Sequence, residues 1–481
     1  MRRAADRALW LLPPLLSLAL YWQGLWCELQ QDDFAWLGLR LEIHGPSDLL
    51  RVLFEPRAQG TGRPISERLY FLVFSELFGL WALPYRLTAF AFQTANLLLL
   101  NAVTRRLTGS AAAGCMAAIG WAASSSTAVP MSWSAAFNQI LCGFCILSAF
   151  LFLLRYVETG QARDWKLQWV FYLFGFGALE LNIVYPALAS AYAALVAPKL
   201  LRKTLPMWAP ALAYFALHRW FASAVPAGPY TVHFGVSMLD VLFDYWQRAL
   251  GPAQLGLVRP VPSWFGLAGT ALLTVALLGF AGVQARRGRR QGLFMLAWFL
   301  IAIAPYLPLR DQRMHYYPFL AAAGLAMLGG WALRQSSERG RASGVAAAAL
   351  ALLYLGSSTP VGRAQMFYHY VRGQRVKPLV EGVVQAHRLD PDKTILLDGI
   401  DEPLFWGGVN DEPFRLFKVY DVFLVPETSE SGTERYRNQR PRFELSAVEI
   451  RSRVRSESAI VLRLEGLQLQ DVTADWWREE P

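Results

Sequence analysis

A chain of 481 residues, of which 54% are hydrophobic and only 17% are charged, is too apolar for an ordinary soluble protein, where about a quarter of the residues carry a charge. Several stretches approach the roughly 20 apolar residues that a helix needs to cross a bilayer. The net charge of +10 does not indicate a nucleic-acid partner, because the basic residues fall in short runs between apolar segments, as the positive-inside rule produces.

Apolar segments follow one another from the N-terminus to about residue 360. They are residues 8–27, 67–83, 86–104, 111–129, 135–154, 167–183, 184–198, 205–221, 263–284, 291–308, 315–333 and 343–358. The segment 67–83 is the weakest, because Glu67, Arg68 and Glu76 interrupt it, and an interfacial or re-entrant segment is the alternative. The pattern predicts a polytopic α-helical membrane protein with about 11–13 spans.

The basic runs also predict which side of the membrane each loop occupies. With Arg2 and Arg3 inside, the loop after the first span lies outside. With the basic run 334–341 inside, residues 360–481 lie outside as well. The two counts disagree by one crossing between residues 67 and 110, and the sequence alone leaves that disagreement open.

Two loops between the spans are unusually long. Residues 28–66 contain short amphipathic segments at 37–43 and 49–54, which we expect to lie along the membrane surface as interfacial helices. Residues 222–262 form a second external loop.

The composition changes after residue 359, where charged and turn residues become frequent and apolar spans cease. We therefore predict two domains, a transmembrane domain of residues 1–359 and a small C-terminal extracytoplasmic α/β domain of residues 360–481. The expected elements of the second domain are a helix at 377–389 and strands at 394–398, 417–425 and 459–464.

Two adjacent carboxylates, Asp32 and Asp33, follow the first span directly. Placing carboxylates next to hydrocarbon costs free energy, which indicates a functional role for the pair. An acidic turn in a solvated loop is the simpler alternative. Arg63 follows a flexible Gly-Thr-Gly turn and precedes the next apolar segment, so it is a second candidate functional residue. The alternative is that its side chain only anchors the segment by snorkelling to the membrane interface.

Further polar groups occur near the external ends of later spans. Glu180 and Asn182 interrupt an apolar stretch, and a packing ion pair with a neighbouring helix is the alternative for the acid. The segment 310–318 carries Arg310, Arg313, His315 and Tyr316, which suit an anionic phosphate or, alternatively, a lipid headgroup.

One kind of chemistry uses all of these groups. A carboxylate can accept the proton of an attacking hydroxyl, and arginines can neutralise a departing phosphate as its charge grows. The sequence contains no Walker loop, no cluster with metal-ligand spacing and no defensible Ser-His-Asp set. The pattern favours transfer of a group from a lipid phosphate to a hydroxyl acceptor.

The order of several short motifs resembles the GT-C superfamily of polyprenyl-phosphate-sugar-dependent glycosyltransferases, in the bacterial branch of the protein O-mannosyltransferases. The motifs are Asp32-Asp33-Phe34, Arg63-Pro64, Phe78-Gly79-Leu80, Tyr85-Arg86-Leu87, Asn96 to Asn101, Arg106-Leu107, Glu180 before Pro186, and Arg313 to Pro318. Arg86 stands where His is common in the family, and Leu179 replaces the Lys of its Ser-Lys-Glu segment. The resemblance covers residues 28–110 and short islands up to residue 320.

The resemblance implies an inverting hexosyl transfer on the external face of the bacterial inner membrane, to a protein, lipid or glycan acceptor. Asp32 would be the general base, and Asp33 would orient the base or the acceptor. The implied donor-phosphate residues are Arg63, Arg310, Arg313, His315 and Tyr316, and the implied sugar and acceptor pocket consists of Glu180, Asn182 and Asn138. No nucleotide, flavin or other cofactor is implied, and metal dependence stays open.

Two alternatives use the same residues differently. In a flippase or exporter of lipid-linked sugars, Asp32, Glu180 and the arginines would line a pathway, although the related halves typical of transporters are not detectable. In a non-catalytic scaffold of envelope glycan assembly, the C-terminal domain would recruit an enzyme.

Overall fold

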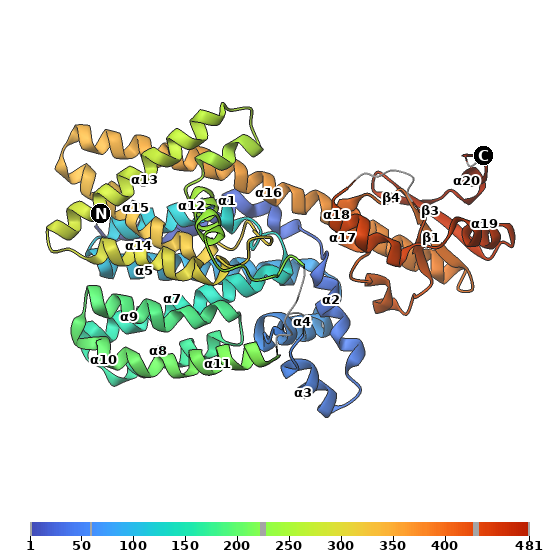
Figure 1. The fold of residues 1–481 in the computed structure, drawn as a ribbon, viewed down its shortest axis with the longest axis horizontal. Coiled ribbons are helices and arrows are strands. Elements are labelled where there is room, and N and C mark those ends of the chain that lie inside the picture. The colour runs from blue at the N-terminus through green and yellow to red at the C-terminus, as the bar shows by residue number, and fades with distance from the viewer. Residues whose placement is uncertain (1, 58–59, 222–227, 427–431, 480–481) are drawn as a thin grey trace. The chain divides into compact units, whose positions relative to one another are not determined.

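The structure, a computed structural model, describes residues 2–57, 60–221, 228–426 and 432–479 (Figure 1). The chain is mostly helical and forms two compact units. Unit 1 consists of residues 1–25, 53–69 and 86–367, and unit 2 of residues 26–52, 70–85 and 368–481. The predicted domain boundary at residue 359 stays a prediction, and helix α16 (Arg341–Leu389) continues through it.

Unit 1 is built from helices. They are α1 (Arg2–Tyr21), α5 (Ala82–Thr108), α6 (Ala111–Ala122), α7 (Phe137–Thr159), α8 (Ala162–Gly175), α9 (Tyr185–Leu195), α10 (Leu201–Thr204), α11 (Trp208–Phe221), α12 (Ser237–Leu250), α13 (Ser263–Arg286), α14 (Gln291–Ile303), α15 (Phe319–Arg339) and the first half of α16. Within it, α7 packs along α8, and α14 lies beside α15 (Figure 1).

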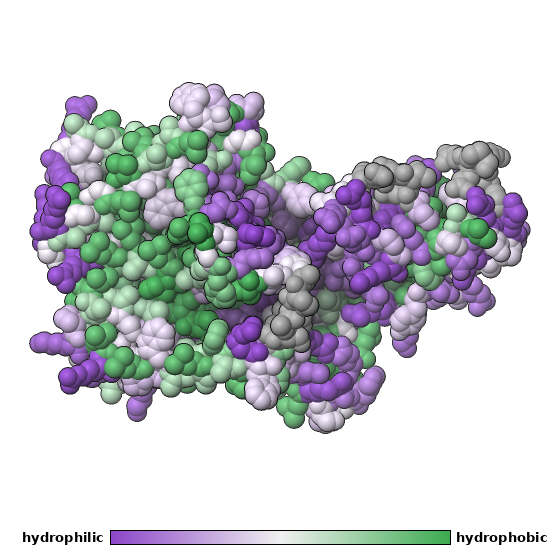
Figure 2. All heavy atoms as spheres, viewed as in Figure 1, coloured by the Kyte–Doolittle hydropathy of each residue, from purple (hydrophilic) through white to green (hydrophobic). Residues whose placement is uncertain are grey.

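Several of these helices are long and apolar enough to cross a membrane. Among the described residues they are the segments Arg7–Trp26, Ala82–Thr108, Ser134–Thr159, Ser263–Arg286 and Arg341–Leu389, with shorter apolar helices at Ala111–Ala122 and Gln291–Tyr306. Hydrophobic residues dominate the middle of the surface that unit 1 shows in Figure 2, and hydrophilic residues border it. The prediction of a polytopic α-helical membrane protein is confirmed.

The segment 67–83 does not form one long helix. It forms a π-helical stretch, Pro64–Leu69, followed by helix α4 (Tyr70–Phe78). Nine residues of α-helix rise only about 13.5 Å, whereas the hydrocarbon core is roughly 30 Å thick. Leaving out this crossing removes the one-crossing disagreement between the two ends of the chain.

The second long loop is also more ordered than predicted. Within residues 222–262, helix α12 is followed by a 3-10 segment, Pro252–Leu257, while residues 222–227 lie outside the described part of the chain. Val241, Tyr245 and Ala249 of α12 are buried and share one helix face, because they are spaced by four residues.

Helices α6 and α15 approach closely in unit 1 because small residues face each other. A Cβ placed on Gly330 of α15 would lie 2.6 Å from the backbone nitrogen of Ala117 and 2.7 Å from the carbonyl oxygen of Ala113. A Cβ on the neighbouring Gly329 would meet only the tip of Leu277, at 4.0 Å. Close backbone approach through glycine is a common way of packing helices in membranes.

We therefore expect Gly330→Ala to lower the stability of the protein and Gly329→Ala not to lower it. Gly330→Ala forces apart two backbones and should cost about 1–3 kcal/mol. Gly329→Ala should be neutral or stabilising, because alanine favours helix by up to about 1 kcal/mol over glycine. Thermal unfolding of the two purified variants checks this, and equal melting temperatures would contradict the close approach.

Unit 2 contains the only β-sheet of the described residues. Its strands are β1 (Thr394–Asp398), β2 (Val422–Leu424), β3 (Ala459–Glu465) and β4 (Gln468–Asp471), in the order β2-β1-β3-β4. β1 pairs in parallel with β2 and β3, and β4 is antiparallel to β3. The small C-terminal α/β fold is confirmed.

Short helices complete unit 2. They are α2 (Asp32–Gly38), α3 (Pro46–Phe54, in part), α4, α17 (Glu402–Gly408), α18 (Glu434–Gln439), α19 (Ala447–Arg455) and α20 (Thr473–Glu479). Of the amphipathic segments expected at 37–43 and 49–54, the first falls mostly on the 3-10 segment Leu39–Glu42 and the second on α3, and their position along a membrane surface stays a prediction. A core of apolar side chains, including Leu396, Val461 and Ile450, joins the sheet to α19.

The predicted strand at 417–425 is shorter than expected. Only Val422–Leu424 is extended, because Phe417 ends a 3-10 turn and Lys418 has a φ of 63° in the left-handed region. Strand β4 was not predicted, since its sequence Gln-Leu-Gln-Asp is mostly polar and short, as edge strands are.

Candidate functional site

The acid pair starts helix α2 in unit 2. Asp33 is fully buried, and its Oδ2 accepts a hydrogen bond from the backbone N–H of Gln30 at 3.0 Å. Asp32 is half-buried. Gln31, just before the pair, has φ 56° and ψ −134°, a conformation that costs a non-glycine residue about 1–3 kcal/mol and recurs at functional sites.

The surroundings of Asp32 bring its titration close to neutral pH. Burial raises the pKa of Asp32 to about 6, and the nearby carboxylate of Asp411 adds to the increase. The guanidinium groups of Arg435 and Arg372 act in the opposite direction. A carboxylate that exchanges its proton near the working pH suits general base catalysis.

The charged groups that act on Asp32, namely Asp411, Arg435 and Arg372, were not among the residues predicted from the sequence. Arg372 lies on α16, Asp411 precedes a 3-10 turn, and Arg435 is in α18 with its guanidinium 4.8 Å from the ring centre of Trp406. None of the three belongs to a recognisable motif. Only the unusual number of polar residues on α16 after residue 368 could have drawn attention to Arg372.

A separate cluster of charges, entirely within unit 1, surrounds Arg63. Its Nε lies 2.8 Å and 3.0 Å from the two carboxylate oxygens of Glu180, and its Nη1 donates to Glu67. Asn138 of α7 donates from Nδ2 to Glu67 at 2.8 Å. Three candidate residues, Arg63, Glu180 and Asn138, thus belong to one cluster, and their roles stay predictions. Glu67, which joins them, stood out in the sequence only as an interruption of a span.

The cluster places two carboxyl groups around one guanidinium, and the neighbouring Arg68 interacts electrostatically with both Glu67 and Arg63. The side chain of Glu67 is only 3% exposed, and those of Arg63 and Glu180 are about one-fifth exposed. Burial raises the pKa of Glu67, while Arg63 opposes the increase. A cation held between two acids is fixed in orientation, which is useful for a group that binds a phosphate or a sugar hydroxyl.

Asn182 makes a different set of contacts. It is fully buried in unit 1 and donates from Nδ2 to the carbonyl oxygen of Tyr172 at 2.7 Å. A Cβ on Gly175 would lie 2.2 Å from its Oδ1. The side chain thus stabilises the turn between α8 and α9. Its assignment to a sugar pocket stays a prediction.

The arginines of segment 310–318 already have carboxylate partners. Arg313 lies 2.6 Å from Asp240 and 3.9 Å from Asp244 of α12. Arg310 pairs with the adjacent Asp311 at 3.0 Å and is almost half exposed. A phosphate would have to compete with these carboxylates, and the phosphate-binding assignment of both arginines stays a prediction.

His315 and Tyr316 complete this segment. Arg248 of α12, paired with Asp244 at 2.9 Å, lies 3.3 Å from Nδ1 of His315. Burial lowers the pKa of His315 to about 4, and Arg248 adds to the decrease, so the ring is neutral at pH 7. Tyr316 packs edge-on against Trp133 with ring centres 6.3 Å apart.

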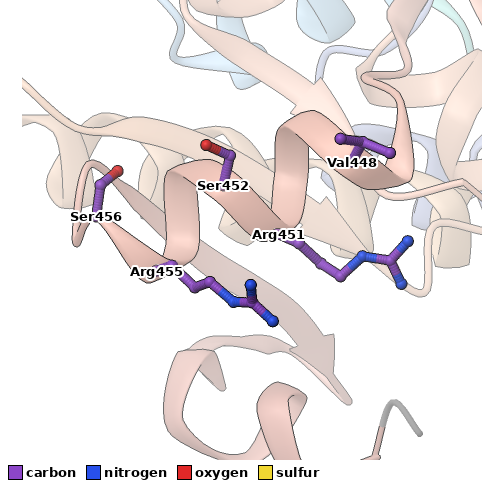
Figure 3. A pocket seen from close by; sticks show the side chains of 5 residues that line it. All are labelled: Val448, Arg451, Ser452, Arg455 and Ser456. Carbon is purple, nitrogen blue, oxygen red and sulfur yellow. The ribbon is translucent and has the colours of Figure 1, made fainter.

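Two other features of the described residues bear on possible ligands. No group of three or more His, Cys, Asp or Glu side chains among them is arranged to hold a metal ion. A hollow of about 470 Å³ lies on α19 and contains none of the candidate residues (Figure 3). It is lined by Val448, Arg451, Ser452, Arg455 and Ser456.

No protein-family model and no curated protein matches this sequence. In structure, the chain is similar to ArnT from Cupriavidus metallidurans in the apo state, with a TM-score of 0.51 at 12% identity over 94% of this chain and 92% of that protein. ArnT bound to undecaprenyl phosphate gives a TM-score of 0.47 at 14% identity, with the same two coverages.

A further similar structure is the oligosaccharyltransferase AglB from Archaeoglobus fulgidus in complex with an inhibitory peptide and a dolichol-phosphate, with a TM-score of 0.47 at 12% identity over 83% of this chain. The chain spans only 62% of the length of that enzyme. The similarity to apo ArnT extends over nearly the whole of both chains. This chain therefore has the fold of ArnT, and the resemblance of its motifs to the GT-C superfamily agrees with that fold.

Proposed function

We propose that the chain is an integral-membrane glycosyltransferase that moves a sugar from a polyprenyl-phosphate donor to a hydroxyl acceptor, with inversion at the anomeric carbon. The observation that carries the proposal is Asp32, a half-buried carboxylate with a pKa of about 6 at the start of α2, in a chain with the GT-C fold. Such a group is suited to accept the proton of an attacking hydroxyl at neutral pH.

In the proposed reaction the acceptor hydroxyl loses its proton to Asp32 as its oxygen attacks the anomeric carbon. The bond between that carbon and the phosphate oxygen breaks, and the electron pair leaves with the polyprenyl phosphate. The added negative charge on the phosphate needs a nearby cation. The resemblance implies Arg63, Arg310 and Arg313 as candidates for this cation, and in each of them the guanidinium already pairs with a carboxylate that a phosphate would have to compete with.

The placement of loops supports an external site. With α4 excluded as a span, the basic runs at both ends of the chain agree that Asp32 and residues 360–481 face outward. We therefore place the reaction on the external face of a bacterial cytoplasmic membrane.

The direct test is cleavage of the donor. The purified protein in lipid nanodiscs is incubated with a set of undecaprenyl-phosphate hexoses and a membrane extract that supplies acceptors. Mass spectrometry should detect free undecaprenyl phosphate together with a glycosylated acceptor. Intact donor with every hexose of the set would contradict the proposal.

The rate of transfer should depend on pH in the manner of a carboxylate base. Because the pKa of Asp32 is raised to about 6, the base is ionised above that pH and protonated below it. We expect kcat/KM to fall about tenfold per pH unit below pH ~6 and to level off above it. Initial rates measured from pH ~4.5 to ~8 check this, and a rate that stays constant down to pH ~4.5 would contradict the assignment.

A further inference from the structure

A buried chain of hydrogen bonds within unit 2 connects the C-terminal half of α16 to the acid pair. Arg372 donates from Nε to Oε1 of Gln30 at 2.6 Å. The backbone N–H of Gln30 donates to Oδ2 of Asp33 at 3.0 Å. Gln30 and Asp33 are fully buried and Arg372 is 7% exposed, so the chain of contacts is shielded from water.

Both functional groups of the Gln30 side chain are occupied. Its Nε2 donates to the carbonyl oxygen of His369 at 3.1 Å, one turn before Arg372 on the same helix. Arg372 also places Nη2 3.2 Å from Nδ1 of His369. Buried polar networks that are this fully satisfied specify one conformation, because every alternative leaves a group unpaired.

The backbone next to the acid pair is held by the same part of the chain. The N–H of the strained Gln31 donates to the carbonyl oxygen of Gly407 in α17 at 2.7 Å. A Cβ on Gly373 would lie 3.1 Å from the backbone nitrogen of Glu28, a tight contact, so glycine favours the close approach of the helix to the loop. An energetically unfavourable backbone persists only where its surroundings impose it.

We propose that Arg372 is a positioning residue that, through Gln30, holds the turn of Asp32 and Asp33 in the conformation required for catalysis. The inference rests on the proposed function of the acid pair and extends it to the C-terminal domain. That domain then acts on the reaction through the geometry of the base. No sequence motif in residues 368–410 indicates this role. The hydrogen bonds of Arg372, His369 and Gly407 to Gln30 and Gln31 are the observations that indicate it.

The test compares two arginines of the same helix. Arg372→Gln removes the donor to Gln30 and its charge, whereas Arg375→Gln, one turn further on, removes an ion pair with Asp401 at 2.6 Å on a side chain that is 28% exposed. Since small misplacements of a catalytic group can cost about 100-fold, we expect Arg372→Gln to lower kcat by about 10- to 100-fold with little change in KM. Arg375→Gln should stay near wild type.

A second variant, Gln30→Leu, distinguishes the positioning effect of Arg372 from the electrostatic effect of its charge. It removes the side-chain hydrogen bonds of Gln30 to Arg372 and to the carbonyl oxygen of His369 but keeps the Arg372 guanidinium, so it should lower kcat without moving the acid limb of the pH profile. Arg372→Gln should move that limb upward by up to about one pH unit, because a cation near the base is lost. The loss of kcat in the double variant Gln30→Leu/Arg372→Gln should be smaller than the product of the two single losses, since both substitutions break the same network.

The charged or titratable groups around the acid pair and Arg372 are Asp411, Arg435, Arg40, Tyr85, Tyr368 and His369.

Hydrogen exchange provides a readout that does not depend on activity. The amides of Gln30 and Gln31 should exchange at least about tenfold faster in Arg372→Gln than in Arg375→Gln, while the amides of β1 and β3 exchange alike in both. Equal exchange at residues 28–34 in the two variants would overturn the inference. Faster exchange with unchanged transfer would overturn it too, whereas unchanged transfer in Asp32→Asn would instead refute the proposed function.

Discussion

Asp32→Asn should lower the rate of sugar transfer by about 100- to 10,000-fold, the range expected when a general base is lost. The amide keeps the size of the carboxyl group but cannot accept the proton of the acceptor hydroxyl. Donor binding should change little, because Asp32 is assigned to proton transfer and no donor contact is assigned to it. The rate is measured as the release of undecaprenyl phosphate from the donor that the wild type cleaves.

Two matched variants make this result specific. Asp421→Asn alters an exposed aspartate of the same unit and should transfer at the wild-type rate. Asp33→Asn keeps an oxygen that can accept from the Gln30 N–H, so its effect should be smaller than that of Asp32→Asn. A large loss in Asp33→Asn with none in Asp32→Asn would reverse the two roles.

Arg63→Gln should destabilise the protein and abolish transfer. Without the guanidinium, Glu67 and Glu180 remain as partly or fully buried carboxylates with no cation between them. Breaking a buried ion pair by removing one partner typically costs about 3–5 kcal/mol. Thermal unfolding of the purified protein in detergent should therefore show a clearly lower midpoint than the wild type.

The control is Arg51→Gln, which removes an exposed pair with Asp48 at 3.4 Å and should cost no more than about 1 kcal/mol. Arg63→Gln combined with Glu180→Gln removes one of the uncompensated charges and should recover part of the stability, yet still fail to transfer. Full recovery of transfer in the double variant would show that Arg63 serves only the fold.

The parts of the fold that could be predicted from the sequence are those set by hydrophobicity. Apolar segments predicted most helices of unit 1, although α12 lies in a segment predicted as a loop, and the apolar segments 394–398 and 459–464 predicted the two central strands of the sheet. The extent of α16 could not be predicted in this way. Its helix continues through Pro360, a residue that usually ends helices, and joins a predicted span to a predicted helix of the outer domain.

Candidate site residues can be chosen from the sequence where a charge stands out against apolar surroundings, as at Asp32, Arg63 and Glu180, and their roles stay predictions. The contact of Glu67 with Arg63 was not predicted. A charged residue inside an apolar segment lowers the hydropathy of that segment by the same amount whether its side chain faces lipid or a buried arginine. Arg372 was missed because its partner Gln30 is 342 positions away in the sequence. A contact of that separation is decided by tertiary packing, and no local pattern encodes it.

The central claim, transfer rather than transport, is tested most directly in proteoliposomes that carry an undecaprenyl-phosphate hexose in one leaflet only. With an acceptor extract on the same side, the wild type should convert donor to free undecaprenyl phosphate and glycosylated acceptor, and Asp32→Asn should leave the donor intact and in place. Intact donor appearing in the opposite leaflet, at equal rates in both proteins, would contradict the assignment and identify a flippase.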